Sequence, residues 1–222
     1  MVTAAPPSSS ASSTAASAIR SRVSEARRAG AGRSRRSQSE GSTGPPSSPS
    51  SRWLAGQLGQ CGDLRTDLVD LAETPLPTVL PAFGEAPPPG AAKALAAVSP
   101  RLAAADAFVF VTPEYNHSFP AALKNAIDWH NQEWHGKPVA FVSYGGLAGG
   151  LRAVEQLRVV MAELNATTVR NTVSFHNAFG AFDAEGRVDD PAVDAAAKAM
   201  LDQLTWWAHA LRDAKSVRPY AA

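Results

Sequence analysis

Two uninterrupted apolar runs constrain the fold of this chain most. Residues 107–112 read AFVFVT and residues 137–144 read KPVAFVSY. A strand with one solvent-exposed face alternates apolar and polar residues, whereas continuous runs are typical of strands buried on both faces. Such strands belong to parallel sheets that are covered by helices on both sides. The two runs therefore favour an α/β fold.

Other segments alternate with these runs in the order strand, helix, strand. Further strands are expected at 64–71 and 167–175. Apolar residues at helical spacing predict helices after Arg52, over 91–105, 120–130 and 151–164, and from Pro191 to about Leu211. This alternation implies right-handed crossovers between parallel strands. We expect a three-layer α/β/α sandwich.

The first fifty residues have a different composition. They carry seven Arg against two Glu (+5), which leaves fourteen basic and eighteen acidic residues (−4) in the rest of the chain. They contain fifteen Ser and only four large apolar residues, too few to offset the entropy cost of ordering the backbone. We expect a disordered basic tail over 1–50 and a globular domain over 51–222. The alternatives are a transit segment or a stretch translated out of frame.

Composition also narrows the function classes. The single cysteine, Cys61, rules out an intramolecular disulfide framework and favours a reducing compartment, the cytoplasm. No apolar run approaches the length needed to span a bilayer. The basic run lacks interleaved aromatic residues, so no nucleic-acid partner is expected. Metal binding is not expected either, because no HxxxH or HxH spacing occurs among the five histidines: His117, His130, His135, His176 and His209.

Candidate functional residues follow the two apolar runs. Ligands of open α/β sheets bind in the loops beyond the carboxyl ends of the strands. The loop 112–120 (TPEYNHSFP) offers an aromatic ring, an amide and a hydroxyl between two prolines. The second loop begins Ser143-Tyr144-Gly145-Gly146, and its glycines let the backbone approach a ligand closely. Together the loops predict a slot for a planar ring such as a flavin.

The segment TPEYNHSFPAALKNAIDW (112–129), followed by KPVAFVSYGG, resembles the NADPH-dependent FMN reductase family of flavodoxin-like folds. That family includes quinone and azo-dye reductases. The resemblance covers about Arg52 to Leu211, and the order of elements agrees throughout. It implies a flavodoxin-like sandwich with a parallel sheet.

The resemblance also implies a cofactor and its contacts. FMN would lie between the two loops, against Pro113, Glu114, Tyr115, Asn116 and Ser118 on one side and Ser143, Tyr144, Gly145 and Gly146 on the other. NADPH or NADH would supply hydride, which passes through the flavin to a small acceptor such as a quinone, azo compound or free flavin, with no catalytic side chain required. His117 would lie near the substrate. The protein would be a homodimer or homotetramer.

The N-terminal part departs from the family pattern. Members open with an apolar strand and a Ser- and Arg-containing loop that holds the FMN phosphate at a helix N-terminus. Here Gly41-Ser42-Thr43-Gly44 is similar to the start of that loop, but no apolar strand precedes it. Pro45, Pro46 and Pro49 are unfavourable for the helix that should follow. The first strand, central in flavodoxin-like sheets, is therefore expected to be absent. This favours, as an alternative, a truncated or mis-framed relative that binds no cofactor and has no activity.

A serine hydrolase is a third interpretation. Ser143 or Ser118 would then be the nucleophile. Neither serine lies in a GxSxG elbow, which makes this the least favoured of the three.

Overall fold

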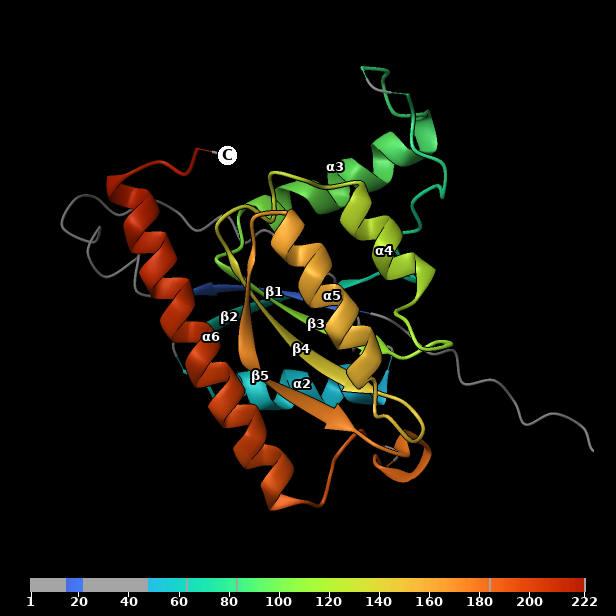
Figure 1. Ribbon diagram of the computed structural model, residues 1–222, viewed down its shortest axis with the longest axis vertical. Helices are drawn as coiled ribbons and strands as arrows, with labels where there is room; N and C mark the ends of the chain where they lie inside the picture. Colours follow the sequence, from blue (N-terminus) through green and yellow to red (C-terminus); the bar gives the residue numbers. More distant parts are fainter. Residues whose placement is uncertain (1–14, 22–47, 63, 83, 184, 222) are drawn as a thin grey trace, which may run out of the picture.

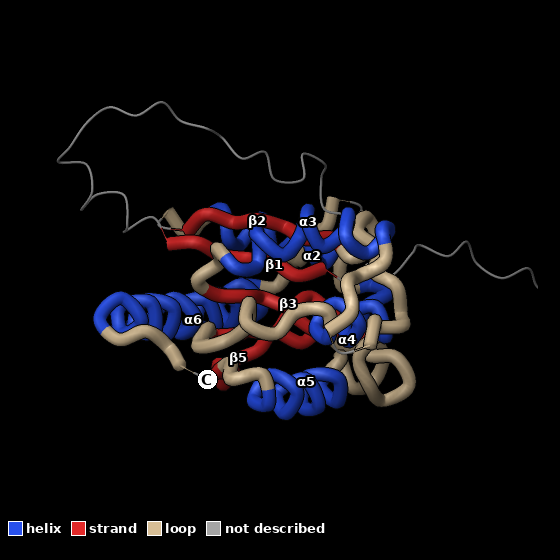
Figure 2. The backbone as a smooth tube through the Cα atoms, turned by 90° about the horizontal axis from the view of Figure 1, so that it is seen from above, coloured by secondary structure: helices blue, strands red, loops and turns tan. Residues whose placement is uncertain are grey.

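The computed structural model describes residues 15–21, 48–62, 64–82, 84–183 and 185–221, the first of these segments as backbone only. Its core is a five-stranded sheet with the order β2-β1-β3-β4-β5. The strands are β1 (Ala15–Ser21), β2 (Leu64–Asp70), β3 (Ala107–Pro113), β4 (Pro138–Tyr144) and β5 (Thr167–Phe175). The helices are α2 (Pro49–Gly59), α3 (Pro89–Ala103), α4 (Ala121–Asp128), α5 (Leu151–Glu163) and α6 (Pro191–Val217), with a 3-10 turn at Ala178–Gly180. Helices surround the sheet in both views (Figures 1 and 2).

The apolar runs form the central strands, as their composition predicts. All seven residues of β3 are buried, and so are the first six of β4. Val109 and Val111 lie in a core cluster that includes the apolar residues of α2 and α6. Phe108 and Phe110 point to the opposite side, where the cluster includes residues of α3, α4 and α5. The expected three-layer sandwich is confirmed.

The strand and helix expectations agree with the structure from Leu64 onward. β5 occupies 167–175 as predicted, and α3 continues through Pro100. The last helix extends past the expected end at Leu211, to Val217. Within the described part of the chain, every helix falls short of the length or the apolar character that a membrane span requires.

The first strand corrects one expectation. A strand, β1, fills the central position that we expected to be vacant, and it runs antiparallel to both β2 and β3. β3, β4 and β5 pair in parallel, so the sheet is mixed. The physical reason is hydrogen bonding: β2 and β3 would each leave a row of unpaired backbone groups beside an empty position, and even a segment poor in apolar residues can pair with them. The other residues of the expected tail lie outside the described residues.

The start of α2 corrects a second expectation. Pro49 is the first residue of α2, not an obstacle to it. Proline is favoured in the first turn because its missing N–H would have no partner there. Ser48 caps the helix by accepting a hydrogen bond from the N–H of Ser51 at 3.1 Å. Gly41–Gly44, Pro45 and Pro46 lie outside the described residues.

Candidate functional site

The candidate site lies at the edge of the sheet where β3, β4 and β5 end. The strands end at Pro113, Tyr144 and Phe175, and the loops that follow meet at this edge. The N–H of Glu114 donates to the carbonyl oxygen of Tyr144 at 3.0 Å. This bond joins the loop after β3 to the loop after β4. The structure therefore brings together the two loops that the sequence singles out.

The loop after β3 is a tight turn that exposes an aromatic ring. The N–H of Tyr115 donates to the carbonyl of Ser118 at 2.8 Å, and the reciprocal bond is 3.0 Å. Asn116 and His117 form the exposed tip of the turn. Tyr115 is 46% exposed, a large value for a ring at the end of a buried strand. Its ring and the adjacent polar tip are available to a ligand.

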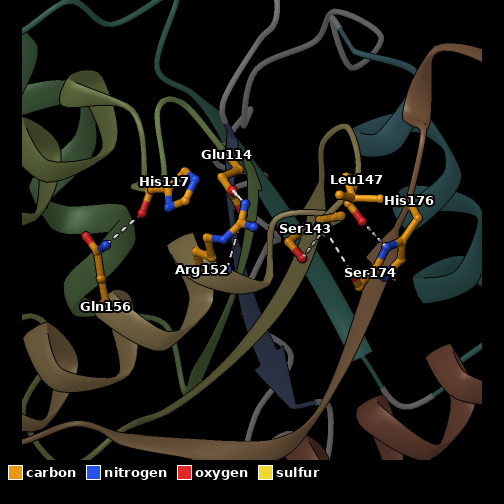
Figure 3. A network of polar contacts seen from close by, with 9 residues as sticks. Glu114, His117, Ser143, Leu147, Arg152, Gln156, Ser174 and His176 are labelled. Carbon is orange, nitrogen blue, oxygen red and sulfur yellow. Dashed lines mark hydrogen bonds and ion pairs between the residues drawn. The ribbon is translucent and has the colours of Figure 1, made fainter.

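The carboxylate of Glu114 has a structural partner (Figure 3). It accepts from the guanidinium of Arg152 at 2.7 Å and from the backbone N–H of Arg152 at 3.2 Å. The Glu114 side chain is 9% exposed. A carboxylate is favoured there because Arg152 lies in the first turn of α5, the positive end of the helix dipole. Glu114 thus ties its loop to α5 through its carboxylate and to the second loop through its backbone N–H.

Two serine hydroxyls form hydrogen bonds to the backbone of the loop after β4. The hydroxyls of Ser143 and Ser174 both donate to the carbonyl oxygen of Gly149, at 2.9 and 2.7 Å. The Nδ1 atom of His176 lies 2.9 Å from the carbonyl oxygen of Leu147 (Figure 3). Since a carbonyl oxygen only accepts, this bond places a proton on Nδ1. These contacts fix the loop against the end of β5.

The paired glycines are pinned through their backbone. The N–H of Gly145 donates to the carbonyl of Phe175 at 3.1 Å, and the carbonyl of Gly146 accepts from Asn177 at 2.9 Å. Gly146 is exposed. Its surface lacks a side chain, so a flat ligand can approach the backbone closely.

Tyr144 connects this loop to α2. Burial, and next the nearby Tyr115, raise the pKa of Tyr144, while a side-chain hydrogen bond with Ser50 opposes that shift. The phenol is therefore neutral at physiological pH. Ser50 belongs to the first turn of α2, so the N-terminus of α2 lies beside the second loop.

Sequence reasoning missed a cluster of serine hydroxyls at this helix N-terminus. Ser48, Ser50 and Ser51 are 2–3% exposed. The hydroxyl of Ser48 lies 2.8 Å from that of Ser51 and 3.1 Å from that of Ser50. The sequence does contain a pattern that predicts a helix start: a serine followed by proline at the first helical position.

The other missed residues lie on α5 and β5. Arg152 and Gln156 contact the first loop, and Ser174 and His176 contact the second. These contacts join residues 25 to 39 positions apart, and no local pattern marks them. No group of three or more His, Cys, Asp or Glu side chains suited to a metal occurs in the described part of the chain.

Known proteins resemble this chain in sequence. An NAD(P)H-dependent FMN reductase of Saccharomyces cerevisiae is 53% identical over 66 residues, which cover 30% of this chain and 34% of the yeast protein. A probable NADPH:quinone oxidoreductase of Oryza sativa subsp. japonica is 34% identical over 152 residues, 66% of this chain and 72% of the rice protein. The chain thus spans only about a third of the first relative but more than two thirds of the second.

A solved structure shares the fold. The structure of RosB with bound 8-demethyl-8-formylriboflavin-5'-phosphate aligns with a TM-score of 0.53 and 12% identity, over 84% of this chain and 78% of RosB. The sequence pattern of the NADPH-dependent FMN reductase family matches residues 41–180, which include both loops and α2 but not β1. This match covers well over half of the chain, and the chain belongs to the NADPH-dependent FMN reductase family.

Proposed function

We propose that this protein is an FMN-dependent NAD(P)H oxidoreductase. The observation that carries the proposal is the meeting of three segments at one edge of the sheet. The loops after β3 and β4 are joined by the bond from Glu114 to Tyr144, and Tyr144 reaches Ser50 at the start of α2. The family pattern includes all three segments.

The serines of α2 fit the phosphate of FMN. Three hydroxyls lie at the first turn of α2, and a helix N-terminus favours an anion. Ser48 and Ser51 bond each other here, so binding a phosphate would require their hydroxyls to turn toward it. The first turn of α2 contains no acidic residue that would repel the phosphate. We therefore infer that Ser48, Ser50 and Ser51 hold the phosphate in place of the usual Ser- and Arg-containing loop.

The ring of FMN would extend from there to the two loops. Tyr115 and Asn116 would contact it on one side and Gly145 and Gly146 on the other. FMN held there would supply the hydride-transfer chemistry between NAD(P)H and an acceptor, so the protein's own residues would need to bind and orient but not to supply a triad. The acceptor would be a quinone, azo compound, flavin or similar small molecule, and His117 at the exposed turn would lie near it.

A spectrum and a rate test this proposal. Purified protein, incubated with FMN and freed of excess ligand, should retain visible flavin absorbance and oxidise NADPH or NADH in the presence of a quinone. A colourless protein that neither retains FMN nor oxidises NAD(P)H contradicts it. The same result supports the alternative, a relative without cofactor or activity. The structural observation in favour of that alternative is β1, which precedes the family match and runs antiparallel to its neighbours.

A hydrolase is not favoured by the serine contacts. The Ser143 hydroxyl donates to Gly149 and the Ser118 hydroxyl donates to Gln156 at 2.6 Å, so each already has an acceptor other than a histidine. Ester hydrolysis that disappears in Ser143→Ala would revive this interpretation.

We also infer that the protein is a homodimer or homotetramer with a cytoplasmic location. The catalytic domain is residues 51–222, together with the first residues of α2, which begins at Pro49. The single cysteine supports the location. Light scattering during gel filtration tests the subunit number, and a monomer at micromolar concentration contradicts it.

A further inference from the structure

Two residues of the turn after β3 have a backbone conformation that is unfavourable for residues with a side chain. Asn116 has a φ of 50° and His117 a φ of 69°. Both are L-residues in the left-handed region, which costs most residues about 1–2 kcal/mol and which Asn and His adopt more readily than other side chains. The two backbone bonds between Tyr115 and Ser118 close the turn but do not fix it to the rest of the protein. Something outside the turn has to hold it in place.

Gln156 makes that connection (Figure 3). Its Nε2 donates to the carbonyl oxygen of His117 at 2.7 Å, and its Oε1 accepts from the hydroxyl of Ser118 at 2.6 Å. One primary amide thus binds two successive residues of the turn. Both bonds bridge α5 and the loop, across 39 and 38 residues of sequence.

Gln156 is an exposed residue on a helix that is packed against the sheet. It lies in the second turn of α5, and its neighbour Leu157 is fully buried against the sheet. Arg152, one helical turn earlier, holds Glu114 at the other end of the same loop. Residues four apart share one face of a helix, so α5 presents two matched contacts to the loop.

The chemistry of the contact requires an amide. The partner at His117 only accepts a hydrogen bond, and the partner at Ser118 donates one. Glutamine supplies a donor and an acceptor at the same time, whereas an ionised glutamate supplies acceptors only. A carboxylate at this position would bind Ser118 but repel the carbonyl of His117.

We propose that Gln156 is a positioning residue for the flavin, because it holds Tyr115 and Asn116 in the strained turn that faces the cofactor. This inference rests on the proposed function, since it takes FMN as the ligand of the turn. In this proposal Gln156 contacts the turn and not the cofactor. Its effect reaches the ligand through the backbone of residues 115–118.

Gln156→Glu tests the proposal with a change of one functional group. FMN should bind about tenfold more weakly at pH 7, since a lost hydrogen bond with added repulsion corresponds to roughly that factor. Hydrogen exchange of the amides in a 113–120 peptide should be faster by a similar factor, with no flavin present. Gln132→Glu makes the same change at an exposed glutamine beyond α4 and should alter neither quantity.

Protonation gives a second readout that a general loss of stability would not. A protonated glutamate again offers one O–H donor and one acceptor. An ordinary glutamate has a pKa of about 4.3, so lowering the pH from 7 to about 4.5 should bring the exchange of 113–120 and the FMN affinity of Gln156→Glu back toward wild type. Each value is compared with wild type at the same pH.

The outcomes separate this inference from the proposed function. If wild type does not retain FMN, the proposed function fails, while hydrogen exchange still reports whether Gln156 holds the turn. If wild type binds FMN and Gln156→Glu has unchanged FMN affinity, unchanged exchange at 113–120, or no recovery at low pH, the positioning role is wrong.

Discussion

Gly150 is the single residue at which the second loop meets α5. Its φ is 88°, and a Cβ there would lie 2.5 Å from the Cβ of Ser143 and 2.9 Å from the backbone nitrogen of Tyr144. The position therefore combines a left-handed backbone with contacts too short for a side chain. The close packing of the loop against the strand end depends on this residue.

Gly150→Ala should lower the free energy of unfolding by about 2–5 kcal/mol, the sum of the left-handed penalty and overpacking. Urea unfolding followed by tryptophan fluorescence measures it. Gly56→Ala is the control, since Gly56 lies within α2 and a Cβ there would meet nothing within 4 Å. That change should stabilise the protein by about 0.5–1 kcal/mol. Equal effects of the two substitutions would contradict the close contact.

Tyr144 predicts a dependence of stability on alkaline pH. Burial raises its pKa above the ordinary value of about 10, so the folded state keeps the proton while the unfolded state loses it. Stability from this group is complete below about pH 10. It then falls by roughly 1.4 kcal/mol for each pH unit until the phenol ionises in the folded state.

The measurement is urea unfolding at several pH values between 9 and 11.5. Tyr144→Phe removes the titrating group, so its stability should fall less steeply above pH 10 than that of wild type. At neutral pH the variant should lose about 1 kcal/mol with the hydrogen bond to Ser50. Parallel pH curves for the two proteins would show that Tyr144 is accessible to solvent.

At the scale of elements, α2 combines a structural and a proposed binding role at one end. Ser48 caps the helix through Ser51, and the cluster of hydroxyls is buried beside Tyr144. A cap and an anion site draw on the same groups, the N–H groups of the first turn, and here the N–H of Ser51 already donates to Ser48.

Ser48→Ala should lower the free energy of unfolding by about 0.5–2 kcal/mol through the lost cap. If the same end holds phosphate, the variant should also bind FMN more weakly while its affinity for riboflavin, which lacks the phosphate, is unchanged. Fluorescence titration with both flavins measures this difference. Equal losses for FMN and riboflavin would place the phosphate elsewhere.

The helices and strands whose sequences show a clear apolar pattern lie where the sequence predicts them. β3, β4 and β5 lie where continuous apolar or β-branched residues predict strands, and α5 spans 151–163 where 151–164 was expected. These segments carry their information locally, since burial on one or both faces imposes a period on the sequence. The Ser48 cap is an exception, because nearby prolines predict the end of a helix as readily as its first turn.

The whole molecule depends on a strand that no pattern predicts. β1 pairs with β2 on one side and β3 on the other, so it makes the sheet continuous. Without it, β2 would have no strand partner among the described residues. The integrity of the fold therefore depends on backbone pairing at a segment poor in apolar residues.

Ala18→Pro tests this role. Ala18 pairs with Phe108 of β3 and Asp67 of β2. Proline removes a backbone donor and is excluded from central strands, so the protein should lose about 3 kcal/mol or more, or fail to fold. Ala18→Gly keeps the N–H and should cost only about 0.5–1 kcal/mol. Circular dichroism with urea measures both, and an unchanged Ala18→Pro midpoint would remove β1 from the sheet.

The sequence by itself determined the α/β class, the order of elements from β2 to α6 and the two loops of the candidate site, because burial and turn chemistry leave periodic and local patterns. Only the tertiary structure decided the direction of β1, the nearness of Ser50 to Tyr144 and the contact of Gln156 with the turn. These features join residues that are far apart in the chain. Their formation depends on how packed elements present hydrogen-bonding groups to one another, and no short segment of sequence encodes that arrangement.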